Sequence, residues 1–124
     1  MTVGASAMLG TWEGPLDDEP HVVPQEFGLR TGCRWFELLD SRSGETLTIE
    51  AVEPVALAIS ATRYTPADLF AAANDVDLVE RDEVVVCVDV AHRGLGTASC
   101  GPDVLPQYRL PAGRYEFAYR LSLH

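Results

Sequence analysis

Hydrophobic and polar residues alternate along much of the chain. In RYEFAYRLSL, residues 114–123, the apolar side chains occupy every second position, namely Tyr115, Phe117, Tyr119, Leu121 and Leu123. Strict alternation of this kind predicts a β-strand buried on one face. Residues 45–52 (ETLTIEAV) and 52–61 (VEPVALAISA) alternate in the same way. Residues 84–90 are apolar at nearly every position, which predicts a central strand covered on both faces.

The strand at 45–52 is predicted to form a hairpin with a strand that precedes it. RWFELL, residues 34–39, predicts a strand, and SRSG at 41–44 predicts the turn that joins it to the next one. We therefore predict an all-β fold, an antiparallel β-sandwich of two packed sheets with one short helix. Residues 1–24 carry little periodicity and are rich in Gly, Pro and acidic residues, so we expect an N-terminal extended segment there and the sandwich core over 25–124. A chain of 124 residues fits one domain.

The predicted helix lies in TPADLFAAAN, residues 65–74. Thr65 can cap it, and Pro66 suits the first helical position. Asp68 comes three residues after the cap, which gives a capping-box-like start with Asp in place of the usual Glu. Asn74 marks the predicted end of the helix.

Composition and charge exclude several classes of partner. The 19 acidic residues outnumber the 9 basic ones, for a net charge of −10. A surface with this much negative charge repels phosphate backbones and anionic lipids. We therefore expect no nucleic-acid partner and no membrane docking. No apolar run approaches the ~18 residues of a membrane span, and MTVGASAML lacks the basic start of a secretory signal. The odd, widely spaced cysteines Cys33, Cys87 and Cys100 indicate reduced thiols, so we expect a cytoplasmic protein.

A long loop, HRGLGTASCGPDVLPQY at 92–108, is the main candidate for chemistry. Its GLG, residues 94–96, precedes more loop instead of a helix N-terminus, which disfavours phosphate binding. His92 and Cys100 lack the paired short-spaced ligands of a metal site. Ser99 lacks a strand–elbow–helix context, and spacing nominates no carboxylate pair. The residues alone therefore indicate a soluble β domain without catalytic or metal-binding residues of its own.

Three stretches together resemble one family. PQEFGLRTGCRWFEL at 24–38 is similar to the P-Q-E-x-G-x-R-x-x-x-R-W segment of the large bacterial β-galactosidases of glycoside hydrolase family 2. SATRYTPADLFAA at 60–72 resembles the family's S-x-x-x-Y-T/S-x-x-x-L segment. DVAHRGLGTASCGPDVLPQYRLPAGRYEFAYRL at 89–121 resembles its C-terminal stretch, with H-x-G-(L/I)-G and S-(C/W)-G-P. The resemblance implies a fragment covering about the last half of the C-terminal, small-chain domain, a large β-sandwich.

The same resemblance implies what this chain contributes. The catalytic glutamates and the magnesium site of such enzymes lie in other parts, so we expect no catalytic residue, metal ligand or cofactor here. The expected partners are the remainder of the β-galactosidase chain and a galactoside substrate bound in a composite site. The same resemblance implies that five residues of the loop bind substrate: His92, Ser99, Cys100, Gly101 and Asp103. Some relatives place a sugar-stacking Trp where this sequence has Cys100, so direct stacking by this loop is not expected.

Two alternatives remain open. A stand-alone carbohydrate-binding module would use Trp12 or Trp35 as a sugar platform, although the apolar neighbours of Trp35 favour a core position. Alternatively, the apolar strands at 84–90 and 114–123 leave apolar surface or unpaired sheet edges exposed. The chain would then form a homo-oligomer, because a second copy covers this surface.

Overall fold

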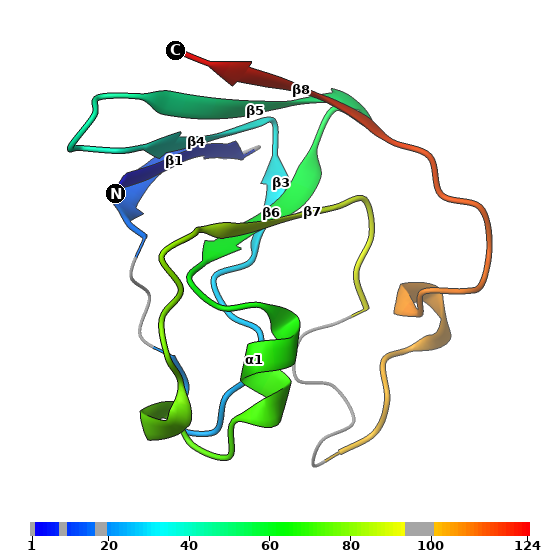
Figure 1. The fold of residues 1–124 in the computed structure, drawn as a ribbon. Coiled ribbons are helices and arrows are strands. Elements are labelled where there is room, and N and C mark those ends of the chain that lie inside the picture. Colours follow the sequence, from blue (N-terminus) through cyan, green and yellow to red (C-terminus); the bar gives the residue numbers. More distant parts are fainter. Residues whose placement is uncertain (1, 8–9, 17–19, 94–100) are drawn as a thin grey trace.

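The computed structural model describes residues 2–7, 10–16, 20–93 and 101–124, which form two packed β-sheets beside one short helix (Figure 1). Helix α1 spans Pro66–Ala71, and two single turns of 3-10 helix, η1 (Asp75–Asp77) and η2 (Pro106–Tyr108), lie in the connections. The strands are β1 (Thr2–Ala7), β2 (Gly10–Pro15), β3 (Arg30–Cys33), β4 (Trp35–Leu39), β5 (Thr46–Glu53), β6 (Leu57–Thr62), β7 (Val85–Asp89) and β8 (Ala118–Leu123).

Every strand pairing in the described residues is antiparallel. The first sheet has the order β2-β1-β4-β5-β8, and the second has the order β3-β6-β7. The chain passes from β3 to β4, and again from β5 to β6, by crossing between the two sheets. These features confirm the predicted all-β, antiparallel sandwich with one short helix.

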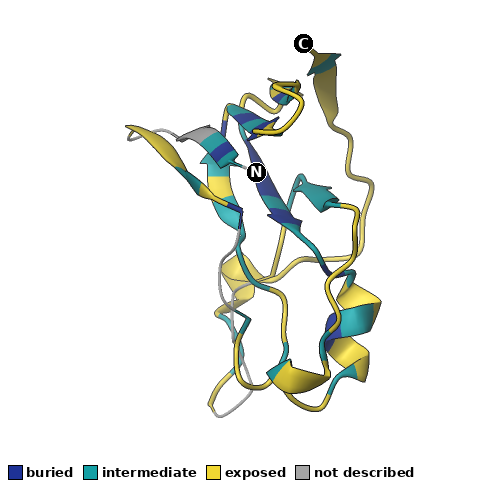
Figure 2. Cartoon of the chain, turned by 60° about the vertical axis from the view of Figure 1, so that its left-hand side comes forward, coloured by how far each residue is buried: buried dark blue, intermediate teal, exposed yellow. Residues whose placement is uncertain are grey.

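The core lies between the two sheets because alternate side chains of their strands turn inward. On β4 and β5 the buried side chains are Phe36, Leu38 and Ile49, while Glu50 is exposed. On β6, Leu57 and Ile59 are 2% and 0% exposed. Figure 2 shows this buried layer in dark blue within the strands, while the helical turns and long connections are mostly exposed. Among the described residues, the buried cluster consists of Val3, Leu16, Cys33, Phe36, Leu38, Ile49, Leu57, Ile59 and Ala61.

The predicted hairpin is confirmed as β4 and β5, with its turn at residues 40–45. The Asp40 carboxylate accepts hydrogen bonds from the Arg42 backbone N–H at 2.9 Å and from the Ser43 hydroxyl at 3.2 Å. The Arg42 N–H is the main reason that the pKa of Asp40 lies below its usual value. Gly44 closes the turn with φ +78°, a left-handed conformation that favours glycine.

The N-terminal residues contribute two strands to the first sheet. β1 and β2 pair with each other from Thr2↔Pro15 to Ala7↔Gly10, and β1 also pairs with β4. Val3 is 1% exposed and belongs to the core. Part of the 1–24 segment is therefore built into the sandwich, although its sequence shows little periodicity.

Two burial predictions are wrong, and both concern strands at sheet edges. β7 is not central but forms one edge of the three-stranded sheet, and its side chains are half-buried. β8 forms an edge of the five-stranded sheet and begins at Ala118, later than the alternating pattern. Its apolar residues Tyr119, Leu121 and Leu123 are 42%, 57% and 68% exposed. The physical reason is that three strands do not cover a sheet of five, so the apolar side chains of β8 have no layer opposite them.

Candidate functional site

The two described ends of the long loop are joined through Asp103. Its carboxylate accepts a hydrogen bond from the Arg93 guanidinium and another, at 2.8 Å, from the backbone N–H of Val104. The Nε atom of Arg109 lies 3.5 Å from the same carboxylate. Arg93 and the Val104 N–H together hold the pKa of Asp103 below its usual range. Asp103 thus connects the start of the loop to its exit.

Three of the five predicted substrate-binding residues lie in the described part of the chain, and they differ in exposure. His92 is exposed beside Arg93, and Gly101 is exposed with open space where a side chain would begin. The Asp103 side chain is half-buried between its arginine partners. Ser99 and Cys100 lie outside the described residues. Sequence reasoning missed the two arginines, although opposite charges near both ends of a long loop in an acidic chain were a usable signal.

After the loop, the chain makes a wide excursion and returns as β8 (Figure 1, orange to red). Its large apolar side chains are 42–68% exposed. The Phe117 and Tyr119 rings stack with centroids 6.1 Å apart, and the Tyr115 hydroxyl donates to the Pro111 carbonyl at 2.6 Å. We call this set the apolar strip: Leu105, Tyr108, Leu110, Tyr115, Phe117, Tyr119, Leu121 and Leu123. Large apolar side chains left exposed along an edge strand and the segment before it indicate an interaction site.

The tryptophans are not arranged as free sugar platforms. The guanidinium carbon of Arg30 lies over the Trp12 ring, 4.1 Å from its centroid, and occupies one face. The same ring packs so closely on Gly14 that a side chain there would meet it at 2.5 Å. Trp35 is half-buried and lies against Gly4. Stacking on a sugar needs an open ring face, so this geometry does not favour the carbohydrate-binding-module hypothesis.

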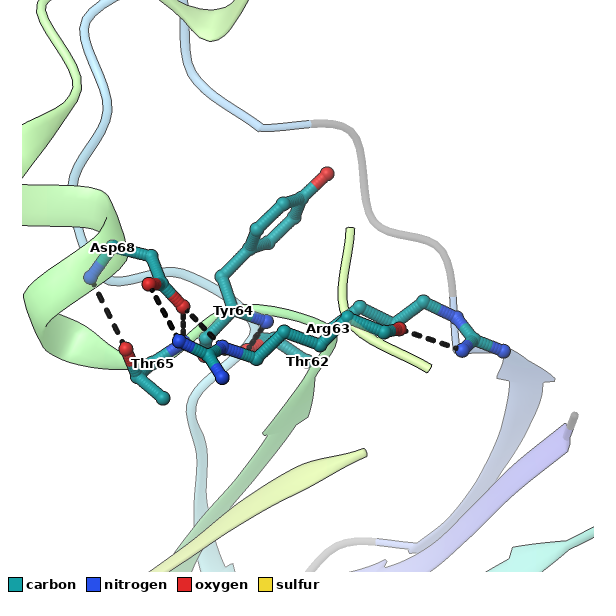
Figure 3. A network of polar contacts seen from close by, with 6 residues as sticks. Thr62, Arg63, Tyr64, Thr65 and Asp68 are labelled. Carbon is teal, nitrogen blue, oxygen red and sulfur yellow. Dashed lines mark hydrogen bonds and ion pairs between the residues drawn. The ribbon is translucent and has the colours of Figure 1, made fainter. Parts of the chain in front are cut away.

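A polar network fixes the start of α1 (Figure 3). The Thr65 hydroxyl accepts the Asp68 N–H at 3.1 Å, and the Asp68 carboxylate accepts the Thr65 N–H at 2.8 Å, which confirms the predicted capping box. Arg81 binds the same carboxylate through Nε at 2.6 Å and Nη2 at 2.9 Å. Arg81, then Thr65, hold the pKa of Asp68 far below its usual value. The helix ends at Ala71, before Asn74, which instead precedes η1.

Two further features are absent from the described residues. These residues contain no group of three or more His, Cys, Asp and Glu side chains arranged to hold a metal ion. Among their helices, none has the length and apolar character needed to cross a membrane.

The fold defines an all-β sandwich domain, and comparison with known proteins gives its family. Residues 4–121 match the beta galactosidase small chain family, so the chain belongs to that family. It is 37% identical over 112 residues to a β-galactosidase of Arthrobacter sp. (strain B7), covering 85% of this chain and 11% of that protein. A β-galactosidase of Actinobacillus pleuropneumoniae is 32% identical over 101 residues, covering 82% and 9%. The chain therefore spans about a tenth of the length of these relatives.

Proposed function

We propose that this chain is a non-catalytic domain of a cytoplasmic β-galactosidase of glycoside hydrolase family 2, an enzyme that hydrolyses terminal β-D-galactosides such as lactose. The domain packs against the catalytic part of the enzyme and supplies a loop at the rim of the active site. Its family membership supports this role, and so does its length of about one tenth of the related β-galactosidases.

The observation that carries the proposal is the apolar strip. Tyr119, Leu121 and Leu123 lie on β8, at the edge of the five-stranded sheet, where backbone groups are also open to pairing. A domain that leaves such a strand half-exposed gains stability when another apolar surface covers it, because burial removes that area from water. The remaining nine tenths of a β-galactosidase chain are the proposed source of that surface.

The loop is the proposed contribution to substrate binding. We assign His92, Ser99, Cys100, Gly101 and Asp103 to the rim of the galactoside site. Asp103 joins the described ends of the loop, because its carboxylate binds Arg93 at one end and Arg109 beyond the other. In the assembled enzyme, Asp103→Asn is therefore expected to raise KM for a β-galactoside more than it lowers kcat, and steady-state kinetics measure both.

Complementation tests the docking role. A related β-galactosidase that lacks the matching tenth of its chain is mixed with the 124-residue protein, and hydrolysis of a chromogenic β-galactoside is followed. We expect no turnover by either piece alone and turnover by the mixture. Leu121→Glu places a charge in the apolar strip and is expected to abolish the gain. Val76→Glu is the matched control, since Val76 is 85% exposed on η1, away from the strip.

Three results would contradict the proposal: turnover by the 124-residue chain alone, a mixture that stays inactive, or equal effects of the two variants. A second copy of this chain is the competing occupant of the apolar strip. Light scattering over a range of concentrations tests it, and a dimer lost in Leu121→Glu would favour self-association.

A further inference from the structure

A pocket of about 440 Å³ lies between the segment 21–29, helix α1 and strands β6 and β7. Ile59 and Ala61 of β6 point into the core, so the alternate residues Ser60 and Thr62 line this pocket on the opposite face of the strand. Its volume falls within the roughly 300–1,000 Å³ usual for small-molecule sites. None of the described loop residues, 92–93 and 101–108, is among those that line it.

The pocket has an apolar interior and a polar rim. Tyr64 and Leu69 are 8% and 4% exposed and form its inner wall. Phe27 adds a second ring, tilted by 54° to that of Tyr64 with centroids 6.3 Å apart. Gln25 and Glu26 lie at the rim and are exposed. Rings beside convergent polar groups are the usual composition of a ligand site.

Several polar side chains of the pocket have unused hydrogen-bonding capacity. Within residues 2–7, 10–16, 20–93 and 101–124, the side chains of His21, Gln25, Glu26 and Ser60 have no hydrogen-bond or ion-pair partner. Thr62 differs, because its hydroxyl donates to the Tyr64 carbonyl at 2.8 Å. Two exposed polar residues of the 21–29 segment and the half-buried Ser60 of β6 therefore line one space.

The pocket is also held open by its own contacts. The Asp75 N–H donates to the Val22 carbonyl at 3.1 Å, which ties the 21–29 segment to η1. The Arg30 guanidinium donates to the Gly28 carbonyl at 2.7 Å, and Gly28 adopts φ +74°, which favours glycine. A ligand thus meets a wall that is already ordered, which reduces the entropy lost on binding.

The chemistry of the lining selects the ligand. No Lys or Arg is among the described residues that line the pocket, so these residues offer an anion no ammonium or guanidinium group. A purely apolar ligand would cover the half-buried Ser60 hydroxyl and displace its water without offering it a partner. We infer that this pocket binds a neutral monosaccharide, with a C–H face of the sugar against Phe27 and its hydroxyls on Gln25, Glu26 and Ser60. This site is additional to the proposed role of the loop and does not rest on it.

Titration of the ¹⁵N-labelled 124-residue chain with D-galactose and D-glucose tests the inference by NMR. We expect saturable shifts confined to residues 21–29, 60–66 and the neighbourhood of Cys87. Glu26→Ala and Ser60→Ala, each removing one hydrogen-bonding group, are expected to weaken binding by about tenfold or more. Glu45→Ala, in the β4–β5 turn, is the control and is expected to leave the titration unchanged.

Absence of saturable shifts with both sugars overturns the inference, as does binding that neither Glu26→Ala nor Ser60→Ala weakens. Tighter binding of inorganic phosphate at the same residues also overturns it.

Alkylation of Cys87 gives an independent readout in a Cys100→Ser background, where the other cysteine, Cys33, is fully buried. Bound sugar is expected to slow it. Because Leu121→Glu leaves the pocket intact, that variant separates this result from the complementation experiment.

Discussion

Ile59 lies at the centre of the core and permits a quantitative test of the sandwich. It is 0% exposed on β6, the middle strand of its sheet, where it pairs with Arg30 and Val88. Ile59→Val removes one carbon and is expected to lower the free energy of unfolding by about 1 kcal/mol. Ile59→Ala removes three carbons, which costs about 2.4 kcal/mol at ~0.8 kcal/mol each. The cavity left behind raises that cost to about 3–4 kcal/mol.

Urea unfolding, followed by the fluorescence of Trp12 and Trp35, measures both variants. A domain is stable by about 5–15 kcal/mol, so Ile59→Ala is expected to remain folded with a clearly lower midpoint and an unchanged m-value. Val79→Ala is the control, because Val79 is 80% exposed and its change is expected within about 0.5 kcal/mol. A cost below about 1 kcal/mol for Ile59→Ala would refute the assignment of Ile59 to a packed core.

Two further predictions concern the start of α1. Thr65→Ala removes the hydroxyl that accepts the Asp68 N–H and is expected to cost about 1 kcal/mol in urea unfolding, whereas Thr65→Ser, which keeps the hydroxyl, is expected to cost less. The bond with Arg81 lowers the folded-state pKa of Asp68, so its stabilisation is complete above the unfolded value of about 3.9 and is lost as pH falls below it. Asp68→Asn is therefore expected to lower the urea midpoint at pH 7 and to flatten its decline between about pH 4 and pH 2; an acid limb as steep as that of the parent protein would contradict this.

Features set by neighbouring residues could be predicted from the sequence. The β4–β5 turn depends on Asp40, Ser43 and Gly44, which lie together in the chain. The capping box depends on Thr65 and Asp68, three positions apart. Both were predicted because the residues that make the contacts are the same residues that carry the sequence signal.

Features set by distant partners could not be predicted. The sequence of β1 is TVGASA, whose small residues give no hydrophobic alternation. Its strand conformation depends on its pairing with β2 and β4. The alternation of 114–123 indicates a strand with an apolar face but not whether another layer covers that face. The pocket joins His21, Ser60 and Cys87, which only the fold brings together. The loop assignments at Ser99 and Cys100 remain predictions.

The pairing of β5 with β8 has a consequence during synthesis on the ribosome. Glu50 and Arg120, 70 positions apart, face each other in this pair and are joined by a hydrogen bond of 2.7 Å. At about 5–20 residues per second, β5 emerges roughly 4–14 seconds before its partner strand. During that interval β5 is an open edge of a growing sheet, where a strand from another nascent chain can pair. Glu50 and Glu53 place negative charge along this edge, so we expect them to disfavour pairing with the same strand of a neighbouring polypeptide until β8 arrives.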